Sequence, residues 1–326
     1  MSSVTLVKAE ILWTRVCPLR CHYCGMRTGY QNTPTSHDWR VGLENLKELG
    51  CQFIAIYGAE PLSDFSKLPQ FVRDVQDLGF SSTLITAGAS GWKDKLRCLH
   101  DAGLRSLTTS YDILPLDSSS AKKSNRAIEM LDFFRSLGDV TNVGVVVTLT
   151  KHNFRGLIST IKQMTEEEIW TFFDVIHWNR GQAGSKVIGR DPTLCFTEDN
   201  LPELKQVVRD VQTLHRAGAL LHCSNSFLET LITTDVVVNM SWNCANEDVF
   251  PSWVTVNCDG MVFPCDDFQP PELAIPMVSL STQLPLRRDE WATTTLRRCP
   301  GCCWNTHVDA HNIKKGELSI DEYIHE

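Results

Sequence analysis

Short apolar runs rich in β-branched residues alternate with longer amphipathic stretches over the first two-thirds of the 326-residue chain. Such runs predict strands, and apolar residues at helical spacing predict helices. Strands are expected at 7–13, 52–57, 81–86, 104–110, 142–150 and 171–177. Helices are expected between them, at 38–50, 65–79, 92–103, 121–137 and 154–168.

Glycine directly follows the last apolar residue of several of these helices, at Gly50, Gly79, Gly103 and Gly138. Glycine in that position is typical of a helix C-terminus. Regular alternation of strands and helices predicts parallel strands joined by right-handed crossovers. Six such units indicate an α/β fold, and the pattern alone leaves open a partial, open (β/α)6 barrel and a doubly wound sheet. The cysteine-rich loop after the first expected strand favours the barrel, whose sites cluster at the carboxyl ends of its strands.

The pattern and composition of the chain change after a further expected helix at 198–217. From about residue 224 the alternation stops, and tryptophan, cysteine and proline accumulate. We therefore place a domain boundary within 218–225, which divides the chain into a barrel at 1–222 and a smaller C-terminal domain at 223–326. A content of 42% hydrophobic residues suits one large core with an appendage.

Charge and hydropathy narrow the range of partners. The chain carries 31 basic and 39 acidic residues, a net charge of −8, which argues against broad binding of a nucleic-acid backbone. The start, MSSVTLVKAEILW, lacks the long apolar core and cleavage site of a secretory signal. No apolar run approaches the roughly 20 residues that cross a bilayer. We expect a cytoplasmic protein without a membrane partner.

Cys17, Cys21 and Cys24 follow the first expected strand in the run CPLRCHYC. Thirteen cysteines in a chain of this kind indicate metal ligands or reactive thiols rather than disulfides. Three thiolates from one short loop suit a four-iron cluster with one iron left open for chemistry. The alternatives are a zinc knuckle or a partial disulfide framework. Zinc prefers four ligands, however, and His22 would reach the same ion only with strain.

This motif, with Tyr23 as the aromatic residue of a C-x3-C-x-aromatic-C pattern, resembles that of the radical S-adenosylmethionine (SAM) superfamily. The resemblance extends over nearly the whole chain. It implies that Cys17, Cys21 and Cys24 hold a 4Fe–4S cluster whose open iron is chelated by the amino and carboxylate groups of SAM. One electron then cleaves SAM to a 5′-deoxyadenosyl radical. An external one-electron reductant, such as flavodoxin or ferredoxin, is the implied protein partner.

The end of the second expected strand, Tyr57-Gly58-Ala59-Glu60-Pro61, resembles the Gly-Gly-Glu-Pro motif of the same family, which receives the amino group of SAM. A carboxylate gives an ammonium group a charge-assisted hydrogen bond, so Glu60 is a candidate together with Gly58 and Ala59. Ala59 replaces the second glycine of the motif, and alanine restricts positive-φ conformations.

Later strand ends carry further candidates. Thr86-Ala87-Gly88 stands where the family often has Thr-Asn-Gly, and Ser110 and Asp112 match positions that commonly contact the ribose or carboxylate of SAM. Ser and Asp also end strands for local reasons, which is the alternative. The run 177–181, HWNRG, ends the sixth expected strand, where its Trp and Arg either bind a carboxylate-bearing substrate or form a solvated loop.

A second group of cysteines lies near the carboxyl end, at Cys244, Cys258, Cys265, Cys299, Cys302 and Cys303. The stretch VTVNCDGMVFPC predicts a hairpin with a turn at Asp259-Gly260. An upstream cysteine, a hairpin ending in Pro-Cys and a later C-x2-C pair resemble the SPASM and twitch domains of radical SAM enzymes.

That resemblance implies a second, auxiliary 4Fe–4S cluster in a single-cluster, twitch-like domain. Its ligands would be Cys244, Cys265, Cys299 and Cys302, with Cys303 competing with Cys302. A structural zinc ribbon is the alternative, because two cysteine knuckles of this shape also bind zinc.

The resemblance predicts an enzyme that removes a hydrogen atom from its substrate, with the auxiliary cluster assisting electron transfer or substrate binding. A small biosynthetic metabolite is the expected substrate, because many peptide maturases of the family begin with a leader-recognition domain, whereas this chain reaches its first strand within a few residues. Maturation of a ribosomal peptide and transfer of the adenosyl group are the alternatives. Two non-enzymatic alternatives are a zinc-bound interaction module and a non-catalytic electron carrier. No catalytic side chain is assigned.

Overall fold

One curled sheet organises the part of the chain that the computed structural model describes, residues 4–19, 21, 24, 38–113, 124–176, 192–239, 241–246, 249–299 and 301–319. Within these residues the sheet has nine strands in the order β6-β5-β4-β3-β2-β1-β7-β8-β9. The strands are β1 (Lys8–Thr14), β2 (Phe53–Gly58), β3 (Ser81–Thr86), β4 (Ser106–Tyr111), β5 (Asn142–Leu149), β6 (Trp170–Val175), β7 (Trp253–Val256), β8 (Met261–Phe263) and β9 (Ile275–Pro276).

The helices of the described residues begin and end close to the predicted bounds in the first two-thirds of the chain. The α-helices are α1 (Trp39–Glu48), α2 (Leu68–Asp77), α3 (Trp92–Asp101), α4 (Ser124–Arg135), α5 (Leu157–Glu166), α6 (Leu201–Arg216), α7 (Asn225–Thr233), α8 (Val236–Asn239), α9 (Leu280–Arg298) and α10 (Asn305–Lys315). The short 3-10 helices are η2 (Pro61–Ser63), η3 (Phe154–Gly156), η4 (Pro192–Leu194), η5 (Cys244–Asn246), η6 (Pro271–Leu273) and η7 (Met277–Ser279). None of these described helices combines the length and the apolar character that crossing a bilayer requires.

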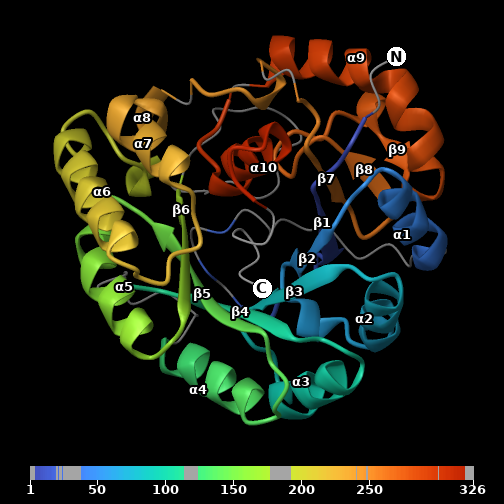
Figure 1. Ribbon diagram of the computed structural model, residues 1–326, viewed down its shortest axis with the longest axis horizontal. Coiled ribbons are helices and arrows are strands. Elements are labelled where there is room, and N and C mark those ends of the chain that lie inside the picture. The colour runs from blue at the N-terminus through green and yellow to red at the C-terminus, as the bar shows by residue number, and fades with distance from the viewer. Residues whose placement is uncertain are drawn as a thin grey trace.

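Strands β1 to β6 are all parallel to their neighbours, and the sheet stays open, as expected for a partial barrel. Helices α1 to α6 form a ring on the outer face of the sheet (Figure 1). A doubly wound sheet would carry such helices on both faces, so that alternative is wrong. Because all six strands run the same way, their carboxyl ends meet at one edge, where barrel enzymes place their sites.

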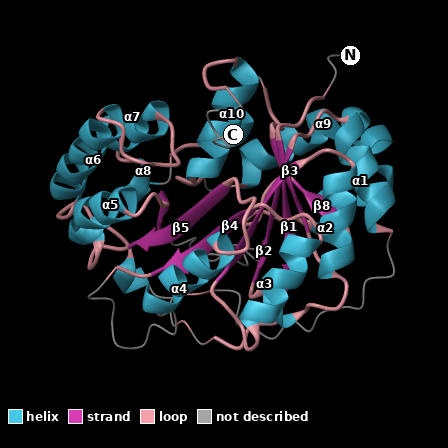
Figure 2. Ribbon diagram, turned by 60° about the horizontal axis from the view of Figure 1, so that its bottom comes forward, coloured by secondary structure: helices cyan, strands magenta, loops and turns pink. Residues whose placement is uncertain are grey.

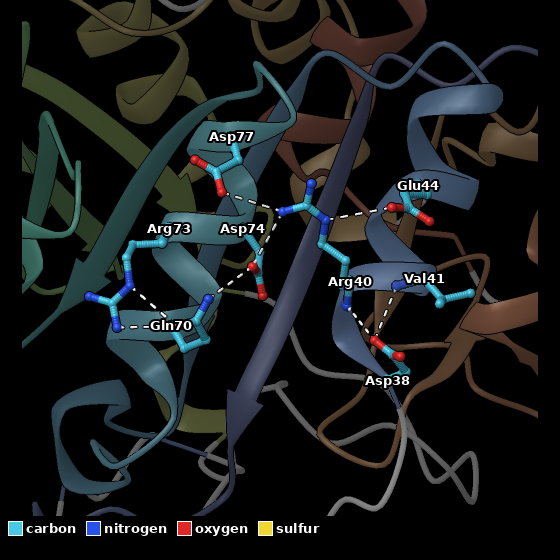
Figure 3. A network of polar contacts seen from close by, with 8 residues as sticks. All are labelled: Asp38, Arg40, Val41, Glu44, Gln70, Arg73, Asp74 and Asp77. Atoms are coloured by element: carbon cyan, nitrogen blue, oxygen red, sulfur yellow. Dashed lines mark hydrogen bonds and ion pairs between the residues drawn. The ribbon is translucent and has the colours of Figure 1, made fainter.

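The contact between α1 and α2 illustrates how neighbouring helices of this ring are joined. Asp38 caps α1 by accepting hydrogen bonds from the backbone N–H groups of Arg40 and Val41, at 3.0 and 3.2 Å (Figure 3). The Arg40 guanidinium lies 3.5 Å from Asp74 and 3.4 Å from Asp77, both on α2. Exposed ion pairs of this kind contribute at most about 1 kcal/mol each, so the apolar faces beneath provide most of the stability.

The carboxyl-terminal third joins the same sheet. Strand β7 pairs with β1 in parallel, with Lys8 opposite Trp253 and Ile11 opposite Val256, and β8 and β9 follow antiparallel. The predicted hairpin is confirmed, with its turn closed by a 2.8 Å hydrogen bond from Gly260 N–H to the Asn257 carbonyl. The domain boundary within 218–225 stays a prediction, and the sheet runs across it.

Helix α10 was not expected, because its sequence has no apolar stripe. Seven of its residues are buried, and five of them are polar or charged: Asn305, His307, Asp309, His311 and Asn312. In Figure 1 α10 lies inside the ring of outer helices, between β6 and β7, and Figure 2 shows it between α7 and α9. It therefore covers the open side of the sheet from within.

Hydrogen bonds offset part of the cost of burying this polar helix. The Asn305 N–H donates to Asp174 on β6 at 3.0 Å, and Asp309 accepts from the Ser224 N–H at 3.1 Å. Burial raises the pKa of Asp309 to about 6, although hydrogen bonds from Ser224 and the charge of Lys8 favour the ionised form. The native protein thus holds a proton on Asp309 up to a pH at which the unfolded chain has lost it.

We predict that Asp309→Asn stabilises the protein above pH 6. The native pKa of Asp309 is raised, so wild-type stability falls as pH rises from about 4, the unfolded value, through about 6. The variant does not lose stability in this range. Its free energy of unfolding should therefore exceed that of the wild type by about 3 kcal/mol at pH 8. Urea unfolding of both proteins between pH 4 and 8 measures the difference, and an advantage independent of pH would contradict the prediction.

Candidate active site

The cysteine loop follows β1 at the edge where the parallel strands end. The Val16 N–H donates to the Thr14 hydroxyl at 3.2 Å, and the Cys24 N–H donates to the Cys21 carbonyl at 3.3 Å. Cys21 is buried and packs against Ile176, directly after β6, in a small apolar cluster. The loop thus spans from β1 across to the far edge of the barrel. Tyr23 lies outside the described residues.

The three thiols of this loop lie close enough for their charges to interact. Burial raises the pKa of Cys17 to about 11, against a backbone hydrogen bond from Leu19 that lowers it, and the charges of Glu60, Cys24 and Cys21 raise it further. Several groups that carry negative charge when ionised therefore lie close together, and little positive charge balances them. A bound cationic metal centre would remove this penalty, because it favours the thiolate forms.

The end of β2 is hydrogen-bonded directly to the cysteine loop. The Ala59 N–H donates to the Thr14 carbonyl at 2.9 Å, and the Glu60 N–H donates to the Val16 carbonyl at 3.1 Å. Gly58 has φ near +146°, and a Cβ atom there would lie 2.6 Å from the Thr14 carbonyl oxygen. This close approach requires glycine. Ala59 is compatible with the turn, because it is not among the described residues with positive φ.

The Glu60 carboxylate joins the ends of β2 and β3. It is fully buried, and one oxygen accepts from the Leu62 N–H at 3.1 Å and the Thr86 hydroxyl at 2.5 Å. The other oxygen accepts from the Ala87 N–H at 2.9 Å. The carboxylate therefore positions the strand ends through these donors. Direct contact between Glu60 and the amino group of SAM stays a prediction.

The remaining strand-end candidates lie at the same edge. Ser110 stands opposite Val146 in the pairing of β4 with β5 and is partly exposed. Asp112, directly after β4, is buried. The run 177–181 lies outside the described residues, so its predicted role at the barrel rim stays untested.

The second group of cysteines is assembled by contacts between distant segments. The Cys302 N–H donates to the Trp242 carbonyl at 3.0 Å, which brings Cys302 beside Cys244 at the start of η5. The Asn243 side chain donates to the Cys299 carbonyl at 3.5 Å, at the end of α9. Cys265 follows β8 on the sheet. Four segments thus converge on one region.

The charges of these cysteines affect one another. Burial raises the pKa of Cys265 well above its usual value, and the charges of Asp267, Cys302, Cys299 and Cys244 raise it further. This is the same pattern as at the amino-terminal loop, and it again suits a cationic metal centre.

The other two cysteines of the group have different partners. The Cys303 thiol points to the Val175 carbonyl at the end of β6, at a distance of 3.9 Å. Burial raises the pKa of Cys258, whereas the charge of Arg15 and a hydrogen bond from it lower this pKa. Both thiols therefore lie on the barrel side of the second cysteine group.

The donor geometry bears on the zinc alternative. Throughout the described ranges, no three Cys, His, Asp or Glu side chains converge closely enough to hold one metal ion. Zinc ions and iron–sulfur clusters both take cysteine thiolates as ligands, so the metal centre at this second group stays a prediction.

Residues 11–176 match the Radical SAM superfamily. The chain belongs to the radical SAM superfamily. This family uses a 4Fe–4S cluster and SAM, as the cysteine motif predicted, and the chain is therefore an enzyme.

Curated relatives of this radical SAM enzyme include two proteins named PqqA peptide cyclase. The one from Methylorubrum populi is 30% identical over 155 residues, 45% of this chain and 39% of the relative. The one from Methylobacterium nodulans is 35% identical over 104 residues, 30% of this chain and 26% of the relative. The matched region thus spans less than half the length of either relative.

Solved structures share the fold. Streptococcus suis SuiB bound to S-adenosylmethionine superposes with a TM-score of 0.64 and 17% identity, over 90% of this chain and 68% of that one. The protein anSMEcpe, with bound AdoMet and Cp18Cys peptide, superposes with a TM-score of 0.60 and 14% identity, over 96% and 97% of the two chains. At these identities the likeness establishes the architecture.

Some contacts of this radical SAM site were not foreseen from the sequence. The resemblance drew attention to Thr86-Ala87-Gly88, but only the structure makes Thr86 and Ala87 donors to Glu60. Arg15 beside Cys258 and His307 beside Cys302 were missed altogether. Arg15 and Cys258 are too far apart in the chain for a motif to mark, whereas His307 follows Cys299 and Cys302 at a C-x2-C-x4-H spacing that could have drawn attention to it.

A pocket among the described residues lies away from this site. It is lined by residues at or near the amino ends of the parallel strands, among them Thr83, Ser106, Asn142 and Trp170. SAM sites at strand carboxyl ends would be on the opposite side of the barrel. We therefore locate the site from the cysteine loop and its hydrogen bonds.

We predict that Gly58→Ala weakens SAM binding at least tenfold and destabilises the fold by about 1–3 kcal/mol, because the methyl group collides with Thr14 in a backbone conformation restricted to glycine. Ala59→Gly is the control and should cost no more than about 1 kcal/mol. Urea unfolding and calorimetric SAM titration of anaerobically reconstituted protein measure both effects. Equal behaviour of the two variants would refute the steric argument.

Proposed function

We propose that this enzyme holds its SAM-cleaving 4Fe–4S cluster through Cys17, Cys21 and Cys24 and seats the methionyl group of SAM beside 58–60. The observation that supports this is the hydrogen-bonded chain from the cysteine loop through Ala59 and Glu60 to the end of β3. When bound, the cluster and SAM supply the electron and the 5′-deoxyadenosyl radical for hydrogen abstraction.

The residues of the chain contribute position and shielding. The carbonyls of Thr14 and Val16 fix the end of β2, and Glu60 fixes the end of β3 relative to both. Cys21 and Ile176 pack together, so apolar side chains cover one side of the cysteine loop. Such packing keeps water away from the radical. Exclusion of water is the main contribution of the protein to this chemistry, because the cofactor supplies the reactive species.

The second cysteine group forms the auxiliary site of this proposal. Its ligands are Cys244, Cys265, Cys299 and Cys302. Their mutual charge effects and the orientation of Cys303 toward Val175 support this set. An external one-electron reductant, a flavodoxin or a ferredoxin, completes the proposed system.

The proposed substrate is a peptide. The relatives that match by sequence are named peptide cyclases, and SuiB has been solved with precursor peptide SuiA. This choice departs from the small metabolite expected from the sequence. That expectation relied on how few residues precede β1, and the number of residues before a strand carries no chemical information about a substrate.

Anaerobic reconstitution tests the cluster assignment. The wild-type protein with dithionite and SAM should release 5′-deoxyadenosine, and Cys17→Ala should reduce the release at least a hundredfold while keeping about half of the iron. Cys244→Ala should also lose about half of the iron but retain SAM cleavage at the first site. Purified protein that contains zinc and no iron would reject the proposal.

A matched pair tests the auxiliary ligands. Cys302→Ser should lower the iron content of reconstituted protein by about half, because it removes a ligand. Cys303→Ser should leave the iron content unchanged, because its thiol contacts a backbone carbonyl on β6. Iron analysis and electron paramagnetic resonance of the reduced proteins measure this, and the reverse outcome would assign Cys303 as the ligand.

Fractionated extract of the source cells tests the substrate class. A peptide substrate should stimulate 5′-deoxyadenosine release from the fraction above about 1 kDa, and protease treatment of that fraction should abolish the stimulation. A protease-resistant stimulation confined to the smaller fraction would reject a peptide in favour of a metabolite.

A further inference from the structure

A histidine contacts the second cysteine group from α10. His307 lies in the first turn of that helix and is 3% exposed. Its Nδ1 atom lies 3.4 Å from the Sγ atom of Cys302. At this distance a nitrogen and a sulfur atom form a hydrogen bond, so the imidazole interacts with one of the four proposed cluster ligands.

Two tryptophans hold the imidazole ring. The Trp253 ring, from the fully buried start of β7, lies 4.2 Å from the imidazole between centroids, at an interplanar angle of 40°. The Trp242 ring lies 6.2 Å away, and the backbone carbonyl of Trp242 accepts the hydrogen bond from Cys302. The ring and the sulfur are thus fixed by the same segment, which limits rotation of the imidazole away from Cys302.

The helix that carries His307 is anchored at several points. The Asn305 N–H donates to Asp174 on β6, and the Asn305 side chain donates to the His222 carbonyl, both at 3.0 Å. The Trp304 indole donates to Asp267 at 2.6 Å, two residues after the proposed ligand Cys265. These contacts come from different elements, so the position of His307 relative to Cys302 is set by the fold and not by α10 alone.

The chemistry of a metal-bound thiolate determines the direction of this hydrogen bond. A thiolate has acceptor sites only, so the imidazole must carry its proton on Nδ1 and donate it to Cys302. Hydrogen bonds to ligand sulfurs are among the factors that set the reduction potential of iron–sulfur clusters. A donor stabilises the more electron-rich, reduced cluster.

We propose that His307 is a positioning residue of the auxiliary site, which donates a hydrogen bond to the Cys302 thiolate and raises the reduction potential of the cluster held there. This inference rests on the proposed function, in which Cys302 is a ligand. It adds a specific side chain that adjusts the electron affinity of the second site.

The test uses the full-length protein with Cys17, Cys21 and Cys24 replaced by alanine, so that only the auxiliary cluster contributes. His307→Phe keeps an aromatic ring between the tryptophans and removes the donor. We expect its midpoint potential, from redox titration followed by electron paramagnetic resonance, to be more negative than that of the parent at the same iron content. His307→Gln, which retains a donor, should fall between the two.

The control is His311→Phe, the same substitution one turn further along α10. The His311 Nδ1 atom lies 2.7 Å from the His307 carbonyl oxygen and 3.0 Å from the Ser252 hydroxyl, and its ring packs edge-on against Trp242 at 5.6 Å. The variant therefore disturbs packing on the same side of α10 without removing the donor to Cys302. It should keep the parent potential.

Three results would overturn the proposal. An unchanged midpoint potential in His307→Phe would show that the hydrogen bond does not affect the cluster. An equal shift in His311→Phe would show that the change comes from disturbed helix packing. Loss of the cluster from both His307 variants would make His307 a residue required for assembly. A parent protein without iron is a separate outcome, because it would refute the ligand set of the proposed function itself.

Discussion

The hydrogen bonds that join the ends of β1, β2 and β3 are the constraint on which the rest of the site depends. Backbone donors of Ala59 and Glu60 attach β2 to the cysteine loop, and the Glu60 carboxylate attaches both to β3. These bonds are possible because parallel strands bring their carboxyl ends to one edge and because Gly58 lets two backbones approach closely. A site on such rigid strand ends can hold SAM and the cluster in one fixed relation.

Closure of the barrel depends on a helix that is polar and buried. Helix α10 occupies the open side between β6 and β7, where a longer sheet would otherwise be needed (Figure 1). Burying Asn305, Asp309 and His307 costs desolvation, which hydrogen bonds to Asp174, Ser224 and Cys302 offset. The same bonds connect the barrel wall to the second cysteine group. Closure of the barrel and the arrangement of that group therefore depend on the same contacts of α10.

The two cysteine groups share an electrostatic property. None of the thirteen cysteines forms a disulfide, and within each group the thiol of one cysteine lies within range of the charges of others, as at Cys17 and at Cys265. Without a cation, burial and the neighbouring charges hold the pKa values of the Cys17 and Cys265 thiols above the usual range. Two cationic clusters would reverse that shift, which makes assembly of the metal centres and stability of the surrounding structure mutually dependent.

Periodicity predicted the strands and helices of the first two-thirds and the Asp259-Gly260 hairpin, and the cysteine motif carried the resemblance to the family that the match over residues 11–176 shows. These features depend on neighbours a few residues away, such as the cysteines of one loop. Contacts between distant residues required the folded chain. They include the pairing of Lys8 with Trp253, the donors around Glu60, the orientation of Cys303 toward β6 and the burial of α10. No local pattern records such contacts, because they arise from how elements far apart in the chain pack against one another.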